Sequence, residues 1–184
     1  MAIYGDSENG EGGKFMESRA KLLGHPIHQM LIVFPLGLLA TGVAFDVIYL
    51  IWGDPTMATV SYYMIAAGII GGFLAAPFGW IDWFAIPSGT RAKSIGLMHG
   101  LGNVVVLLLF IGSWWFRYSS GTSTHIPGTP ALVLSFAGAA LSLVTAWLGG
   151  ELVDRLGVGV DEGANLDAPS SMSGRPATDR VRTA

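Results

Sequence analysis

Histidines and carboxylates lie at one end of four long apolar segments, in a pattern that could bind a cofactor. His25 and His28 open the first segment in the run GHPIH, and His99 lies about one helical turn into the third. Asp82 and Glu151 lie at the ends of the second and fourth segments. Successive membrane spans alternate in direction, so all five residues would fall in the same leaflet. Ionisable groups inside a membrane are costly and usually face the bundle interior, so the pattern predicts a site in this layer.

His99 is the strongest single candidate for a ligand. It lies between Gly96 and Gly100, and Asn103 follows one turn further along the same helix face. The missing glycine side chains leave room for a flat macrocycle or for a closely packed helix. The alternative is a core histidine that is hydrogen-bonded to Asp82 or to a backbone carbonyl.

His28 is the second candidate ligand and His25 is the third. Pro26 suits the first position of a helix, which places His25 at the cap and His28 in the first turn. The positive end of the helix dipole disfavours the imidazolium form, so both rings would stay neutral and able to bind a metal. The alternatives are an interfacial position for His28 and a capping role for His25, which we favour.

Three hypotheses follow from this layer. In the leading one, His28 and His99 are the axial ligands of a b-type haem that transfers electrons, while Asp82, Asn103 and Glu151 orient the ligands. In the second, His28, His99, Asp82 and Glu151 hold a divalent metal such as zinc or iron. In the third, no cofactor binds and the polar layer only joins the helices. No serine or threonine stands beside the histidines in a triad-like motif, so we expect no catalytic residues.

The elements that must position these residues are four apolar segments, at about 27–52, 58–83, 95–116 and 130–153. Each exceeds the roughly 20 residues that a helix needs to cross a bilayer. The composition agrees, with 51% hydrophobic and 12% charged residues. The sequence therefore predicts an all-α, integral membrane four-helix bundle over residues 25–157. A flexible arm (1–24) would precede it and a disordered tail (158–184) would follow.

Basic residues between the segments predict the orientation. One side of the membrane would carry nine Lys and Arg residues, namely Lys14, Arg19, Lys21, Arg91, Lys93, Arg155, Arg175, Arg180 and Arg182. The other side would carry only Arg117, at the edge of the third loop. Because cytoplasmic loops are enriched in Lys and Arg, both termini are expected in the cytoplasm.

Small residues and one acidic residue mark the faces where helices should meet. Gly96 with Gly100, and Gly149 with Gly150, would allow close helix packing, either within one chain or between two copies in a homodimer. Asp46 lies 18 residues after His28, which is five full turns, so both share one helix face. It could belong to a proton path, although a buried carboxylate bonded to a neighbour is the more ordinary interpretation.

Composition excludes several other classes. The formal net charge is −3, and no basic stripe interleaved with aromatic residues indicates a nucleic-acid partner. The chain has no cysteine, which excludes disulfides and thiolate-bound metal centres within it.

Three segments of the chain resemble the DUF2231 family of bacterial membrane proteins. They are GHPIHQMLIVFPLGL, GWIDWFAIPSGTRAKSIGLMHGLGN and WLGGELVDRLGVGVDEGANLDAPSS, and the resemblance extends over about residues 22–170. The family pattern has HPxH opening the first helix, Asp closing the second, His in the third and GGxLV ending the fourth. The matching positions here are His25, His28, Asp82, His99, Gly149, Gly150 and Glu151.

The resemblance implies a protein of the bacterial cytoplasmic membrane, with the lipid bilayer as its first partner, and it implies no particular activity. Some relatives are fused to a Rieske-type iron–sulfur domain, so a redox protein is the expected partner. Relatives often carry a Tyr and a His in the final motif, where this chain has Asp154 and Leu156. A role of that His in relatives would not extend to this chain.

Overall fold

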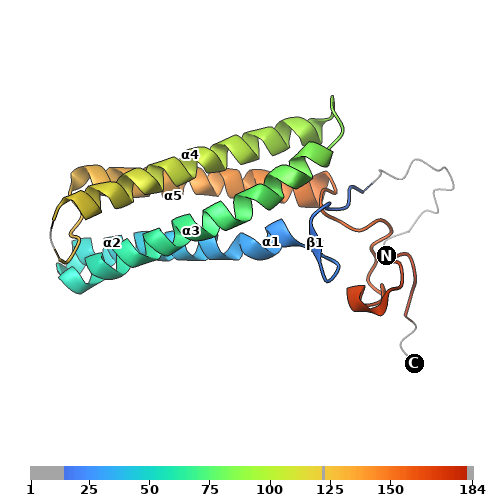
Figure 1. Ribbon diagram of the computed structural model, residues 1–184, viewed down its shortest axis with the longest axis horizontal. Coiled ribbons are helices and arrows are strands. Elements are labelled where there is room, and N and C mark those ends of the chain that lie inside the picture. The colour runs from blue at the N-terminus through green and yellow to red at the C-terminus, as the bar shows by residue number, and fades with distance from the viewer. Residues whose placement is uncertain (1–14, 122, 182–184) are drawn as a thin grey trace, which may run out of the picture.

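Four long helices run side by side in the computed structural model, which describes residues 15–121 and 123–181 (Figure 1). The first span consists of α1 (Ile27–Leu31) and α2 (Val33–Trp52), and the others are α3 (Pro55–Ala85), α4 (Arg91–Ser119) and α5 (Thr129–Gly150). All four spans are long and apolar enough to cross a membrane. The predicted all-α transmembrane bundle is therefore confirmed, and the helix ends fall within a few residues of the predicted ones.

Local sequence signals explain where the helices begin and end. Asp54 caps α3 by accepting a hydrogen bond of 2.8 Å from the backbone N–H of Thr56, and Thr90 caps α4 in the same way. Gly53 ends α2 in the left-handed conformation, with φ of 72°, which glycine adopts without a steric penalty. These short connections make consecutive spans antiparallel neighbours.

The first span is interrupted at Ile32, between α1 and α2. Pro35 follows three residues later and has no backbone N–H to donate to the carbonyl of Leu31, the last residue of α1. The interruption places α1 as a separate turn at the entrance of the span, and His28 lies on it.

The bundle is built from two helical hairpins. One pairs α2 with α3, the other pairs α4 with α5, and α3 packs against α4 between them. We call the end that carries the hairpin of β1 (Lys21–Leu22) and β2 (His25–Pro26) and the C-terminal segment the proximal end. The opposite end, where α2 is connected to α3, is the distal end (Figure 1). An apolar core fills the middle, made by Leu39, Ile65, Ile69, Val106 and Phe110.

The two hairpins repeat the same contacts. In the first, a Cβ added at Gly68 would lie 2.6 Å from the side chain of Leu39. In the second, a Cβ added at Gly138 would lie 2.8 Å from the ring of Phe110. Phe110 follows Leu39 by 71 positions, the same separation as between Asp46 and Arg117. The two hairpins are thus two repeats of one pattern of contacts, with matching glycines that let each pair of helices approach closely.

Short elements cover the proximal end. β1 (Lys21–Leu22) pairs antiparallel with β2 (His25–Pro26), a π-helical turn η1 (Glu151–Arg155) extends α5, and a 3-10 turn η2 (Ser171–Ser173) lies further along. Met16 forms an isolated bridge with Val158, which joins the N-terminal arm to the chain after α5. The division into arm, membrane domain and tail stays a prediction, and residues 1–14 and 182–184 lie outside the described residues.

Large apolar side chains cover the outside of the bundle. Phe84 and Leu143, for example, are 72% and 73% exposed. In water such a surface would be unfavourable, whereas in a bilayer it contacts lipid tails. Contact with the lipid bilayer follows from these spans.

Candidate functional site

Two of the predicted ligands meet between α1 and α4, on the side of the bundle where α1 begins. His28 on α1 and His99 on α4 have ring centroids 6.3 Å apart, with an angle of 87° between the ring planes. His28 lies on α1 at the start of the first span, and His99 lies on α4, the third span. His99 follows His28 by 71 positions, so they are equivalent residues of the two repeats. We call this arrangement the histidine pair.

A backbone carbonyl of the neighbouring helix orients each ring. The Nδ1 atom of His28 lies 3.0 Å from the carbonyl oxygen of Ala75, and that of His99 lies 2.9 Å from the carbonyl oxygen of Thr145. A carbonyl can only accept, so each Nδ1 must carry the hydrogen. Each Nε2 then presents a lone pair, which is the form of imidazole that binds metals.

Each ring also lies against a glycine one turn beyond that carbonyl. A Cβ at Gly79 would lie 2.8 Å from the ring of His28, and a Cβ at Gly149 would lie 3.1 Å from the ring of His99. The carbonyl and the glycine are four residues apart in both helices, at positions 75 and 79 and at positions 145 and 149. The same cradle is therefore built twice, and the sequence pattern alone identified only Gly149.

Asn103 contacts His99, as its position one turn further along α4 predicts. Its Nδ2 atom lies 3.2 Å from Nε2 of His99 and 2.9 Å from the carbonyl oxygen of the same residue. On the other side of the amide, Oγ1 of Thr145 lies 3.0 Å from Oδ1 of Asn103. The threonine hydroxyl thus turns the NH2 group of the amide toward His99.

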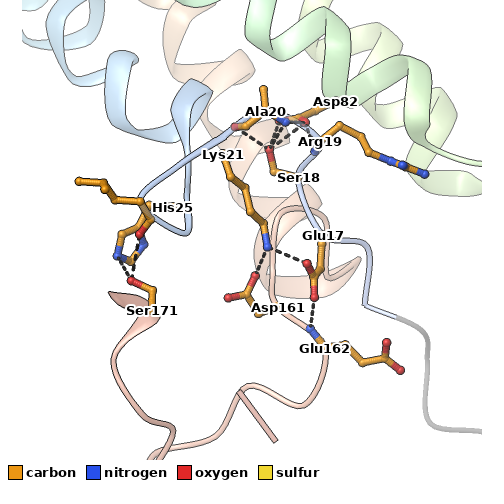
Figure 2. A network of polar contacts seen from close by, with 11 residues as sticks. Glu17, Ser18, Arg19, Ala20, Lys21, His25, Asp82, Asp161, Glu162 and Ser171 are labelled. Atoms are coloured by element: carbon orange, nitrogen blue, oxygen red, sulfur yellow. Dashed lines mark hydrogen bonds and ion pairs between the residues drawn. The ribbon is translucent and has the colours of Figure 1, made fainter. Parts of the chain in front are cut away.

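The two predicted carboxylates have other partners. Asp82, near the end of α3, accepts hydrogen bonds from Oγ of Ser18 at 2.8 Å and from the backbone N–H of Arg19 at 2.7 Å, as Figure 2 shows. Glu151 forms an ion pair with Arg91, with Oε1 and Nη2 2.6 Å apart. Across residues 15–121 and 123–181, no three His, Cys, Asp or Glu side chains come together as a metal site. The structure thus gives no support to the four-ligand site with zinc or iron.

His25 lies outside the histidine pair. Its Nε2 atom is 3.3 Å from Oγ of Ser171, in an exposed position on β2 (Figure 2). It does not cap α1 either, because the cap residue is Pro26 and no side chain bonds the helix N-terminus there. Its separation from His28 by three residues made it look like a ligand, but the extended backbone of β2 turns it away.

A cluster of charged side chains joins the arm to the C-terminal segment, next to Asp82. Nζ of Lys21 lies 2.7 Å from Glu17 and 2.5 Å from Asp161 (Figure 2). The hydrogen bond from Lys21 lowers the pKa of Glu17. Desolvation lowers the pKa of Lys21, but its bonds to Asp161 and Glu17 outweigh that effect, so the pKa is raised. We call Glu17, Lys21 and Asp161 the arm–tail clasp.

A second polar layer lies toward the distal end, and sequence reasoning missed half of it. Arg117 forms a bidentate ion pair with Asp46, with bonds of 2.8 Å and 2.7 Å, and both side chains are 0% exposed. Hydroxyl groups surround the pair, contributed by Ser61, Ser113 and Ser135. The basic-residue count had placed Arg117 at a loop edge, but α4 continues to Ser119 and buries it. Arg117 follows Asp46 by 71 residues, the same separation as between His28 and His99. This repeated spacing was the signal in the sequence that could have paired them.

The apolar core separates the two polar layers. Leu39, Ile69 and Phe110 belong to the buried cluster in the middle of the bundle. Asp46 has a buried guanidinium and serine hydroxyls as partners, which matches the interpretation of a carboxylate bonded to its neighbours. A proton path through Asp46 gains no support from these contacts.

An aromatic stack closes the distal end. The rings of Tyr118, Trp114 and Tyr62 are stacked, with successive centroids 5.5 Å and 5.4 Å apart, and His125 stacks on Tyr62 at 3.8 Å. Tyr and Trp side chains are common at membrane interfaces, where they act as anchors. Here they also pack on one another, beside the buried ion pair.

The glycines predicted for helix packing differ in what they contact. A Cβ at Gly96 would lie 2.8 Å from the Trp83 ring, and one at Gly100 would lie 3.5 Å from the Trp80 ring. Gly149 contacts His99, whereas Gly150 has nothing within 4 Å. Gly96 therefore makes room for the Trp83 ring, whereas a Cβ at Gly100 would be in ordinary van der Waals contact with Trp80.

Four apolar spans, with one polar layer near each end of the bundle, define a multi-pass integral membrane protein. Residues 24–162 match DUF2231, a family described as a predicted membrane protein. The chain belongs to this family, as its sequence motifs indicated. No curated protein and no solved structure matches it.

Proposed function

We propose that this protein holds a redox centre in the membrane through the histidine pair, and that the centre is a b-type haem used for electron transfer. One observation carries the proposal. The rings of His28 and His99 have centroids 6.3 Å apart, and both donate Nδ1–H to a carbonyl, so both present Nε2 as a ligand. Histidine ligands of metals are usually oriented in this way.

The spacing of the rings fits a shared metal. Two imidazoles bound on opposite sides of one metal have ring centres roughly 6 Å apart, because each metal–nitrogen bond is about 2 Å long. The centroids of His28 and His99 are 6.3 Å apart. Asn103 bonds to His99 Nε2, so this amide would have to turn away when a metal binds.

The number of ligands favours haem over a bare metal ion. A zinc site takes three or four protein ligands, and the described part of the chain brings no third His or carboxylate to the pair. Haem iron needs only axial ligands from the protein, and two histidines can supply them. When bound, haem would supply one-electron chemistry, and the protein would supply orientation and burial.

The setting of the site supports the rest of the proposal. Removing the buried Arg117 from the basic-residue count leaves no accessible Lys or Arg at the distal end, so the asymmetry becomes stronger. By the distribution of basic residues, the proximal end and both termini face the cytoplasm, in a bacterial inner membrane. A redox protein on that side, of Rieske type or another kind, would be the electron partner.

An absorption spectrum of the purified protein tests the proposal. Protein from haem-sufficient cells should show a Soret band and, after reduction, sharp α and β bands. His28→Ala and His99→Ala should lose them. His25→Ala is the matched control and should keep them, because His25 is exposed on β2. A flat wild-type spectrum, with no bound metal by elemental analysis, would contradict the proposal.

A second candidate is a scaffold without a cofactor, and one observation favours it. The polar groups of both layers bond to each other, as in the contacts of Asp46 with Arg117 and of Asn103 with Thr145. Such bonds also join helices when no ligand is present. In this case His28→Ala and His99→Ala would change only the stability, and purified wild-type protein would be colourless.

A further inference from the structure

An exposed apolar patch lies at the tip of the β1–β2 hairpin. Leu22 and Leu23 are 53% and 67% exposed, and Met172 on η2 is 76% exposed. Ser171 brings these segments together, because its Oγ donates a hydrogen bond of 3.1 Å to the carbonyl of Leu23. A Cβ at Gly24 would lie only 2.6 Å from Cβ of Ser171, so the contact is close. We call Leu22, Leu23 and Met172 the hairpin patch.

Leu23 is unfavourable at its position both for the backbone conformation and for contact with water. Leu23 has φ of 51° and Gly24 has φ of 83°, so both central residues of the turn are left-handed. Turns of this kind favour Asn or Asp followed by Gly, because a residue with a larger side chain is strained there. The chain nevertheless places a leucine in this position and exposes its side chain, where a polar residue would suit both backbone and water better.

The hairpin patch lies at the level where the chain enters the membrane. β2 leads directly into α1, which begins the first span at Ile27. Leu22 pairs with His25, so only two residues, Leu23 and Gly24, form the turn before β2. Each residue reaches at most about 3.6 Å, and the polar layer of a leaflet is roughly 5–8 Å thick. The tip therefore cannot be far from the lipid headgroups.

The direction of the hairpin agrees with this position. In Figure 1 the hairpin lies just beyond the start of α1, and its turn projects sideways from the bundle axis. A turn that pointed along the bundle axis would extend into water. This one extends across the bundle axis, which is the direction of the plane of a membrane that the four spans would cross.

We propose that the hairpin patch is an interfacial membrane anchor. Leu22, Leu23 and Met172 insert among the lipid headgroups and upper acyl chains of the proximal leaflet. Because Ser171 bonds the patch to η2, the same insertion holds part of the C-terminal segment against the bilayer. The partner is the lipid surface, and the inference is independent of any cofactor at the histidine pair.

The absence of native cysteines permits a direct test. The Leu23→Cys variant is labelled at the new cysteine with an environment-sensitive fluorophore and reconstituted into phosphatidylcholine vesicles. Leu166→Cys, labelled in the same way, is the matched control. Leu166 is 106% exposed on the C-terminal segment, outside the hairpin patch. At position 23 we expect blue-shifted emission, quenching by lipids with a spin label near the headgroup, and protection from aqueous iodide. At position 166 we expect free access of iodide.

Two outcomes would overturn the proposal. The first is equal iodide quenching at positions 23 and 166, with no quenching by labelled lipid. The second is protection at position 23 that increases with the protein-to-lipid ratio, because that would assign the patch to a second copy of the chain. Met172→Cys reports on the same patch from η2, so a folding defect in the turn variant would leave the test intact.

Discussion

The Asp46–Arg117 pair allows a sharp prediction, because the chain contains an exposed pair of the same chemistry. Both side chains of the buried pair are 0% exposed, and two hydrogen bonds of 2.8 Å and 2.7 Å join them. Replacing one partner leaves the other as an uncompensated charge inside the bundle. Asp46→Asn or Arg117→Met should therefore each lower the free energy of unfolding by about 3–5 kcal/mol.

The control is the ion pair of Arg91 with Glu151. Its N···O distance of 2.6 Å is close to the 2.7 Å of the buried pair, but Arg91 is 57% exposed and Glu151 is 17% exposed, so water reaches both charges. Arg91→Met and Glu151→Gln should each cost about 0–1 kcal/mol, because water screens the charges and solvates the one that remains. Burial is then the main difference between the two pairs of variants.

Unfolding in detergent, followed by circular dichroism and tryptophan fluorescence, would measure these differences. The double variant Asp46→Asn/Arg117→Met should lose clearly less stability than the sum of the single variants, because it contains no unpaired charge. Single variants that cost no more than the exposed control, or effects that simply add, would refute the reasoning. That result would mean that water reaches Asp46 or Arg117.

Two further predictions concern the proximal end. Gly79→Ala should displace the ring of His28 and weaken any ligand binding by the histidine pair, because the new Cβ would lie 2.8 Å from that ring. Gly150→Ala is the control. A Cβ at Gly150 would have no atom within 4 Å, so this variant should change neither stability nor the absorption spectrum. The arm–tail clasp should hold only at intermediate pH. Bonds from Lys21 and from the backbone N–H of Glu162 on the C-terminal segment lower the pKa of Glu17 from 4.5, so its contribution is lost as the pH falls below that value. The pKa of Lys21 is raised from 10.5, so its contribution is lost above that value. Distances between spin labels on the arm and tail, measured across this range, should increase at both extremes and stay constant between them; an unchanged distance in acid would contradict the assignment.

Much of the fold could be predicted from the sequence because its signals are local. An apolar run of span length, such as Thr129–Gly150, can only be a helix in a membrane, since lipid offers no partner for backbone groups. Asp54 and Gly53 mark the helix ends through their own capping and conformational preferences. The end of the bundle at which His28 and His99 lie could also be predicted, because each helical residue advances the chain by a fixed rise.

The partners of the polar side chains could not be predicted in the same way. Asp82 and Glu151 lie near the proximal end, as their positions in the sequence indicate, but Asp82 bonds to the arm and Glu151 to Arg91. Arg117 seemed to belong to a loop, yet it is buried against Asp46 on another helix. Position along a helix fixes the depth of a residue, whereas its neighbours depend on how each helix is rotated and which helix packs beside it.

The sequence by itself thus determined the four spans, the polar layer at the proximal end and the selection of His28 and His99. Only the tertiary structure decided that these two rings meet, that Gly79 and Gly149 cradle them, and that no carboxylate joins them among the described residues. The physical reason is that spans form from local hydrophobicity and backbone hydrogen bonding, whereas the rotation of packed helices is set by contacts between residues far apart in the chain.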